Sequence, residues 1–302
     1  MDDITIAQLL DLSIKRAETN GARKDQAYEI NGRRYKNYVD NDTWKAFVNE
    51  MKTMYYPIYE NFAKGAGDEL GIKKVGPYPP KMASYGSSSR MLYLLARNIP
   101  GFCFEKKLYT TVGGKANLDG FLCVNGSRIY VEAKCREPYN SPNRIIDRKY
   151  EELYRCLNRI PRLAFHCDIT ILNEKEMKVD FTVQNTVITR FDIKQMICHL
   201  LGIATEQITA PSKDHVRFIY LLFDPTHLQI EDEPRKDKLL SIYRQETTEC
   251  DAVPFAALYK AIVTYLSQHP AIKPSASASI EQIANNFSFS RCDQVVFRER
   301  MK

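Results

Sequence analysis

Two carboxylates and a lysine lie close together within residues 117–137, which read NLDGFLCVNGSRIYVEAKCRE. Glu132 and Lys134 are two positions apart on a strand-like run, so their side chains are predicted to point to the same face. Asp119 lies on the run before them. Carboxylates and an ammonium gathered on a sheet surface are costly if they serve packing alone. They suit a divalent metal that polarises a phosphodiester and activates water.

A β-hairpin is the element predicted to bring these groups together. Asn125-Gly126 is one of the strongest short hairpin signals, because both central residues of that turn need a positive φ. After the turn, Val131, Ala133 and Cys135 form an apolar face opposite Glu132 and Lys134. Before the turn the alternation is weaker. There it predicts one face with Leu118, Leu122 and Val124 and another with Asn117, Asp119, Phe121 and Cys123.

Mixed helical and strand patterns surround the hairpin and predict an α/β fold with a mixed central sheet flanked by helices. Helices are expected at 5–17, 43–64 (broken at Pro57), 87–98, 147–159, 192–201 (ended by Gly202) and 254–267. Strands are expected at 102–111, 164–172, 178–184 and 216–223. A turn at Asn31-Gly32 suggests a small hairpin or an irregular arm. The intervals 71–86 and 224–253 read as connections.

Three segments are expected along the chain, although one single domain is also compatible. They are an N-terminal helical region at 1–82, a core at 83–225 and a C-terminal helical extension at 226–302. Within the extension, 273–279 (KPSASAS) reads as a flexible tether and the last 23 residues as a small addition.

Composition indicates a folded protein of the cytoplasm. The 302 residues are 44% hydrophobic, and no apolar run is long enough to span a bilayer. The N-terminus begins with acids and lacks the features of a secretory signal. The eight cysteines form no CxxC pair, which favours reduced thiols over a disulfide framework or a zinc site.

The net charge of +6 and the isoelectric point of about 8.7 are compatible with nucleic acid but do not require it. Basic residues with interleaved tyrosines follow the hairpin: Arg136, Arg144, Arg148, Lys149, Arg155, Arg159 and Arg162, with Tyr139, Tyr150 and Tyr154. This suits a phosphate-contacting flank. The alternative is a solvated helix in which Glu151 and Glu152 are ion-pair partners.

Glu-x-Lys alone is a weak signal, because it begins four times in this chain, at Glu50, Glu105, Glu132 and Glu176. The first lies in a helical stripe, where residues two apart do not face each other. The second lacks an acid on a preceding strand, and the fourth begins in a polar turn. Only Glu132 and Lys134 share a strand that has an Asp on its hairpin partner. A surface cluster of salt bridges is the alternative interpretation.

Asp119 followed by Glu132-Ala133-Lys134 resembles the PD-(D/E)xK nuclease superfamily, and the wider pattern is similar to a bacterial family of putative restriction endonucleases within it. The segments that carry the resemblance are 65–70 (GAGDEL), Ser87-Ser88-Ser89 opening a helix, Phe104-Glu105, 117–119 and 132–137 (EAKCRE). The match spans about 65–140 and is weaker to 225. Leu118 stands where the superfamily's name has Pro.

The resemblance implies a restriction-endonuclease-like core and a Mg²⁺-dependent cut of DNA. Asp119 and Glu132 would bind Mg²⁺, with Mn²⁺ as a substitute and the backbone carbonyl of Ala133 as a further ligand. Lys134 would orient or deprotonate the attacking water, or stabilise charge on the phosphate. Related nucleases often add a Glu from an early helix. Here Glu69 is the best substitute and Glu105 a second one, with a surface acid at a helix end as the alternative for Glu69.

Gln195 and His199 resemble the Gln-x-x-x-Tyr helix of some related nucleases, with His in place of Tyr. At about 100° per residue they lie roughly opposite the stripe of Ile193 and Ile197. Their face is expected to meet either solvent or the active-site cleft. Gln195 is the better candidate for a part in catalysis.

Three functions are compatible with these observations. The first is a Mg²⁺-dependent endonuclease of double-stranded DNA, of a type II-like restriction kind, for which a homodimer is one open assembly. The second is a non-catalytic nucleic-acid-binding protein with the same fold. The third is a repair or recombination nuclease that recognises DNA structure.

Overall fold

The computed structural model describes residues 5–19, 25–65, 68–73, 77–140, 144–160, 163–275 and 279–294. Its helices are α1 (Ile6–Thr19), α2 (Asn41–Met54), α3 (Tyr56–Lys64), α4 (Ser88–Ala96), α5 (Glu151–Asn158), α6 (Ile193–Thr209), α7 (Glu233–Ala252), α8 (Phe255–Gln268) and α9 (Ile280–Asn285). Short 3₁₀ turns lie at Lys81–Ala83, Glu137–Tyr139 and Arg148–Tyr150. None of these described helices is long and apolar enough to cross a membrane.

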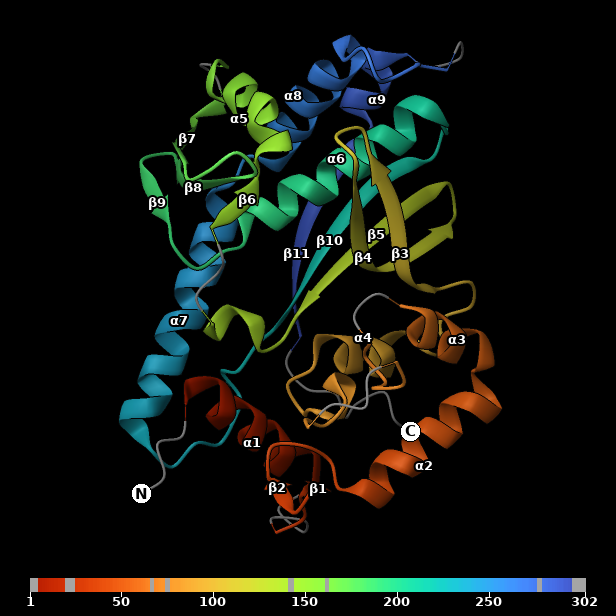
Figure 1. Cartoon of the computed structure of the whole chain (residues 1–302), viewed down its shortest axis with the longest axis vertical. Coiled ribbons are helices and arrows are strands. Elements are labelled where there is room, and N and C mark those ends of the chain that lie inside the picture. The colour runs from red at the N-terminus through yellow and green to blue at the C-terminus, as the bar shows by residue number, and fades with distance from the viewer. Residues whose placement is uncertain are drawn as a thin grey trace.

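A mixed five-stranded sheet is the centre of the fold, in the order β11-β10-β5-β4-β3. Its strands are β3 (Cys103–Thr110), β4 (Gly114–Val124), β5 (Ser127–Lys134), β10 (His215–Phe223) and β11 (Phe287–Gln294). β5, β10 and β11 run parallel, whereas β3, β4 and β5 pair antiparallel. Helices flank this sheet (Figure 1), which confirms the α/β class with a mixed central sheet.

The other strands of the described residues form two smaller sheets. One holds β6 (Ile145–Asp147), β7 (Phe165–Ile171), β8 (Glu176–Val183) and β9 (Thr186–Ile188). The other is the expected N-terminal hairpin, β1 (Tyr28–Ile30) and β2 (Arg33–Tyr35), which turns at Asn31-Gly32.

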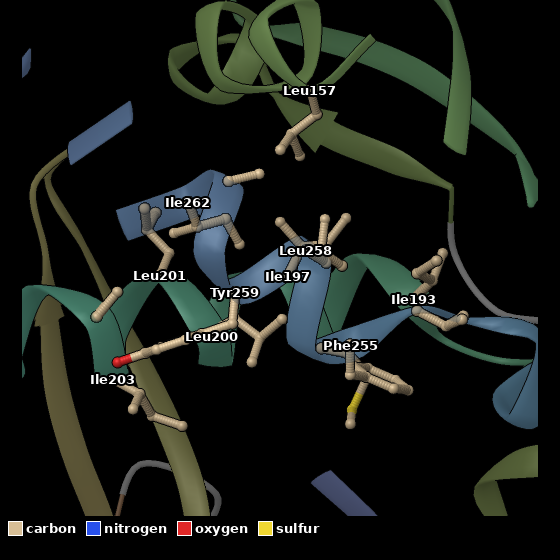
Figure 2. Close-up of a cluster of buried hydrophobic side chains, with 14 of the residues drawn as sticks. Leu157, Ile193, Ile197, Leu200, Leu201, Ile203, Phe255, Leu258, Tyr259 and Ile262 are labelled. Atoms are coloured by element: carbon tan, nitrogen blue, oxygen red, sulfur yellow. The ribbon is translucent and has the colours of Figure 1, made fainter. Parts of the chain in front are cut away.

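The central sheet separates two hydrophobic cores. The core on the α6 side includes Tyr130, Phe218 and Tyr220, and Figure 2 shows α6 and α8 interdigitating within it through side chains such as Ile197, Leu200, Leu258 and Ile262. The core on the α4 side includes Val131, Ala133 and Leu221, with Met91 and Leu92 of α4. In Figure 1 the helices α1 to α4 gather together at one end of the sheet.

The hairpin of β4 and β5 forms as expected, with Asn125 at φ +49° and Gly126 at φ +69°. The predicted faces of β4 are wrong at one point. Leu118 is buried in the α6-side core, and Phe121 packs against the same core, although regular alternation would separate them. The strands are distorted here, because Glu105 on the neighbouring β3 has φ +58° and the ladder between β4 and β5 stops at Gly120 opposite Val131.

Gly202 does not end α6, which continues to Thr209. A Cβ placed at Gly202 would lie 2.8 Å from the Cβ of Ala116 and 3.0 Å from the Cβ of Leu108. The glycine therefore allows the helix to lie close against β3 and β4 and does not serve as a C-cap.

The C-terminal part of the chain differs from expectation in two ways. The interval expected to be a polar connection contains the 20-residue helix α7, whose buried face includes Glu246 and Glu249 and so lacks a clear apolar stripe. The expected helical extension contains α7, α8 and α9 but also β11, which pairs with β10 at eight positions and lies at the edge of the central sheet. Residues 276–278 of the predicted tether and residues 295–302 lie outside the described residues.

Candidate active site at the fork of β4 and β5

Asp119 lies where β4 and β5 separate. The last paired position is Gly120 opposite Val131, so the next pair in register would be Asp119 and Glu132. These two residues do not pair through their backbones. The Oδ2 of Asp119 instead accepts a hydrogen bond of 2.7 Å from the backbone N–H of Ala133. A carboxylate thus takes the place of the missing ladder bond and is fixed beside Glu132.

Glu132 is the most enclosed group of the site, with 1% of its surface exposed. Its Oε1 lies 2.7 Å from the Nζ of Lys134 and accepts a 2.7 Å hydrogen bond from the Nε2 of Gln195. The Nε2 of His199 lies 2.9 Å from Oε2 but is not aligned for a hydrogen bond, so Oε2 is buried without a hydrogen bond to any described residue. α6 therefore turns the face with Gln195 and His199 toward the carboxylate, not toward solvent.

The pKa values of the two carboxyl groups are displaced in opposite directions. Burial works against the charged form of Glu132, but the cation of Lys134 and the neighbouring His199 lower its pKa to about 2. Burial, together with the charge of Glu132, raises the pKa of Asp119 well above its usual range. Burial also opposes the charge of Lys134, yet Glu132, Glu137 and Asp119 raise its pKa. The site thus holds an ionised pair beside a carboxyl group that retains its proton more readily.

Glu105 and Glu69 lie on the side of β3. Glu105 falls opposite Asp119 in the register of β3 and β4. Burial, and then the charge of Glu132, raise the pKa of Glu105, while nearby lysines lower it. The Oε1 of Glu69 lies 3.7 Å from the Nζ of Lys81. Burial raises the pKa of Glu69 despite Lys81, and Glu105 adds to the rise. Among the described residues, no hydrogen bond or ion pair joins Glu69 to Asp119 or Glu132, so the structure brings Glu69 near the site but not into it.

Two residues from the quoted motifs hold the strand end beyond Lys134. The backbone N–H of Cys135 donates to the Oγ of Ser88 at 2.9 Å and to Oε2 of Glu137 at 3.0 Å. The Oγ of Ser88 in turn donates to Glu137 at 2.6 Å. These bonds replace the backbone partners that β5 loses after the fork. Such a role cannot be read from residue types, because it depends on where α4 begins.

Glu246 is a neighbour that sequence reasoning missed. It lies on α7, 1% exposed, and accepts a 2.6 Å hydrogen bond from the hydroxyl of Tyr220. Burial raises its pKa to about 7, and the charge of Lys134 acts against that rise. No local signal marks this residue, since it lies more than 100 positions from the hairpin in a segment that looked like a connection.

Divalent-metal chemistry is compatible with the donors at the fork. Mg²⁺ prefers carboxylate oxygens and keeps several of its waters. The half-buried Asp119 lies beside the buried Glu132 here, and one oxygen of Glu132 has no hydrogen bond to a described residue. Among the described residues, no three Asp, Glu, His or Cys side chains are grouped so that they could hold an ion. An ion would therefore depend on Asp119, Glu132, the carbonyl of Ala133 and water.

The basic flank is largely ion-paired. Arg148 and Arg155 both contact Glu151, at 3.0 and 2.8 Å. The remaining ion pairs of the flank join Arg136 to Asp11, Arg144 to Asp180 and Lys149 to Asp147. Tyr139 and Tyr154 are buried, and Arg162 lies outside the described residues. This favours the solvated, ion-paired interpretation for most of the flank.

Comparison with protein-family models, with curated proteins and with solved structures gives no match to this chain.

Proposed function

We propose that this chain is a Mg²⁺-dependent endonuclease of double-stranded DNA with a PD-(D/E)xK core, of the type II-like restriction kind. The observation that carries the proposal is the convergence of Asp119, Glu132 and Lys134 at the fork of β4 and β5. The central sheet, the flanking α6 and the order of the three residues along the hairpin are all compatible with a restriction-endonuclease-like core.

The displaced pKa values support this proposal. Neighbouring carboxyl groups whose pKa values are displaced in opposite directions are typical of catalytic sites. When bound, Mg²⁺ would relieve the repulsion between the carboxylates, supply a water of lowered pKa and stabilise charge on the phosphate oxygens. Asp119 and Glu132 would hold the ion, and its positive charge would favour the ionised form of Asp119 against the raised pKa of that group.

Lys134 and Gln195 have distinct parts in this scheme. In the absence of an ion, the ammonium of Lys134 neutralises Glu132 at 2.7 Å. With a metal ion held by Asp119 and Glu132, the same ammonium would be free to contact the attacking water or the phosphate. Gln195 holds Glu132 from the other side through its Nε2, which keeps the carboxylate orientation fixed.

One observation favours the non-catalytic alternative. Glu132 already contacts Lys134, Gln195 and His199, which is also what a buried structural ion network looks like. In that case the protein would bind nucleic acid without cutting it.

Cleavage of a supercoiled plasmid with Mg²⁺, compared with EDTA, tests the proposal. We expect wild-type protein to cut only with the metal, and Lys134→Met and Asp119→Asn to lose about 10²–10⁴-fold in rate while still binding DNA. The matched control is Lys178→Met, because Glu176 and Lys178 form a second Glu-x-Lys pair in which Lys178 instead contacts Asp180 at 2.7 Å.

The control should cleave like the wild type. Normal cleavage by both site variants would refute the assignment of these residues. Binding without any metal-dependent cleavage by the wild type would support the non-catalytic alternative.

A further inference from the structure

A cavity of about 390 Å³ lies beside the candidate active site. It is open to the surface and is lined by β6, the 3₁₀ turn Arg148–Tyr150, α5 and the first turns of α6. β6 and α6 lie next to each other in Figure 1. Gln195 lines this cavity and also donates a hydrogen bond to Glu132. The cavity is thus one side chain away from the carboxylate at the fork.

Two tyrosines, Tyr150 and Tyr154, line the cavity. Tyr150 is half-buried, and the Nζ of Lys149 lies 5.4 Å from its ring centroid. Tyr154 is 1% exposed and lines the cavity, and its hydroxyl makes no hydrogen bond to another described residue. Burial, and then neighbours that include Cys198 and Asp192, keep the pKa of Tyr154 well above its usual range. The phenol is therefore a neutral donor that lacks an acceptor.

Hydrogen-bond acceptors also line the cavity. Asp192 caps α6 by accepting from the backbone N–H of Gln195 with Oδ1 at 3.0 Å, and its Oδ2 has no hydrogen bond to a described residue. Gln195 uses its amide nitrogen on Glu132, which leaves its amide oxygen as an acceptor. Asp147 and Lys194 also line the cavity, and Asp147 is ion-paired with Lys149 at 3.3 Å. Apolar side chains (Ile145, Ile146 and Cys198) fill the rest of the lining, so the cavity suits a flat ring with polar edges that both donate and accept hydrogen bonds.

We propose that this cavity binds one unpaired nucleobase of the DNA substrate, and that it prefers a base with an exocyclic amine beside a ring acceptor, as in cytosine or adenine. The amine would donate to Asp192, the ring nitrogen would accept from Tyr154, and the ring would stack on Tyr150. Aromatic stacking of this kind is a general means of holding unpaired bases. The inference rests on the proposed function for the identity of the substrate, but it concerns binding and not cleavage.

Fluorescence anisotropy in EDTA tests the inference without any contribution from catalysis. The probes are labelled hairpin duplexes that carry a single unpaired cytosine, adenine or thymine, with a fully paired duplex as reference. We expect wild-type protein to bind the cytosine and adenine probes roughly fivefold or more tightly than the thymine and paired probes. Tyr154→Phe keeps the ring and removes the donor, and Asp192→Asn keeps the cap and replaces one acceptor with a donor. Both variants should lose the preference.

Tyr259→Phe is the matched control, because Tyr259 is a buried tyrosine on α8, outside the cavity lining, and its hydroxyl makes no hydrogen bond to a described residue. It should keep the wild-type preference. Equal affinity of the wild type for all four probes, no measurable binding of any probe, or an unchanged preference in folded Tyr154→Phe and Asp192→Asn would overturn the inference. A base preference without cleavage would uphold this inference and count against the proposed function. Cleavage without a base preference would do the opposite.

Discussion

At the scale of single residues, the structure assigns one ionisable group an unfavourable position. Glu246 is buried against Tyr220, and burial raises its pKa to about 7 from the ordinary value of 4.5. Below pH 4.5 the carboxyl is protonated in both the folded and the unfolded chain. Between these values the unfolded chain releases the proton first, so the stability contributed by neutral Glu246 falls as the pH rises.

We predict that Glu246→Gln raises the free energy of unfolding by up to about 3 kcal/mol at pH 8 and much less at pH 5. A neutral amide can still accept from Tyr220 but has no charge to desolvate. Urea unfolding at both pH values measures the difference. Glu233→Gln, an exposed glutamate on the same helix, should change stability little at either pH. An equal gain from Glu246→Gln at both pH values would contradict the assigned pKa.

The types and spacing of residues were sufficient to propose the three central groups of the site. Strand periodicity gave the shared face of Glu132 and Lys134, and the Asn125-Gly126 turn returned them toward Asp119. The contacts of His199 with Glu132 and of Ser88 with Cys135 required knowledge of how α6 and α4 dock. The proximity of Glu246 could not be predicted at all, because no local pattern connects α7 to the hairpin.

At the scale of elements, α6 depends on a glycine that lies in its interior. Gly202 faces Ala116 and Leu108 at distances that leave no room for a methyl group. We predict that Gly202→Ala destabilises the protein by about 1–3 kcal/mol through overpacking, although alanine is intrinsically the better helix former by about 1 kcal/mol.

Chemical denaturation of Gly202→Ala measures this effect, and the double variant with Ala116→Gly isolates its cause. Removing the opposing methyl group should restore part of the lost stability, so the two changes should be non-additive. If Gly202→Ala is as stable as the wild type, the close approach of α6 to β4 is not required.

The errors at this scale have physical reasons. A glycine after an apolar stripe usually signals a helix end, but here close packing required the same residue. The sequence predicts a connection in place of α7, because two buried positions of this helix carry glutamate, which obscures the apolar periodicity that marks a helix. α2 and α3 were predicted as a helix broken near Pro57, and the chain does break at Tyr55.

At the scale of the whole molecule, the central sheet lies between the two cores and contributes side chains to both. Phe287 on β11 stacks on Tyr259 with ring centroids 4.1 Å apart, in the α6-side core. Trp44, the one tryptophan of the chain, is buried in the α4-side core. The two side chains therefore lie in the cores on opposite sides of the same sheet.

We predict that Phe287→Ala lowers the free energy of unfolding by roughly 3 kcal/mol and shifts the Trp44 fluorescence transition together with the far-ultraviolet circular dichroism transition. Ser290→Ala, an exposed change on the same strand, should shift neither. A Trp44 transition that stays in place while the circular dichroism transition moves would show that the N-terminal helical region unfolds independently.

β11 also constrains the order in which the molecule can be assembled. The ribosome releases residues 287–294 after every other strand of the central sheet has emerged, and β10 remains an unpaired edge until then. A nascent chain can thus close the hairpin of β4 and β5 early, but it must hold a buried, apolar strand open through the synthesis of α7, α8 and α9. Such late, long-range pairing slows folding and exposes the intermediate to aggregation, so production of this protein should benefit from slow synthesis at low temperature.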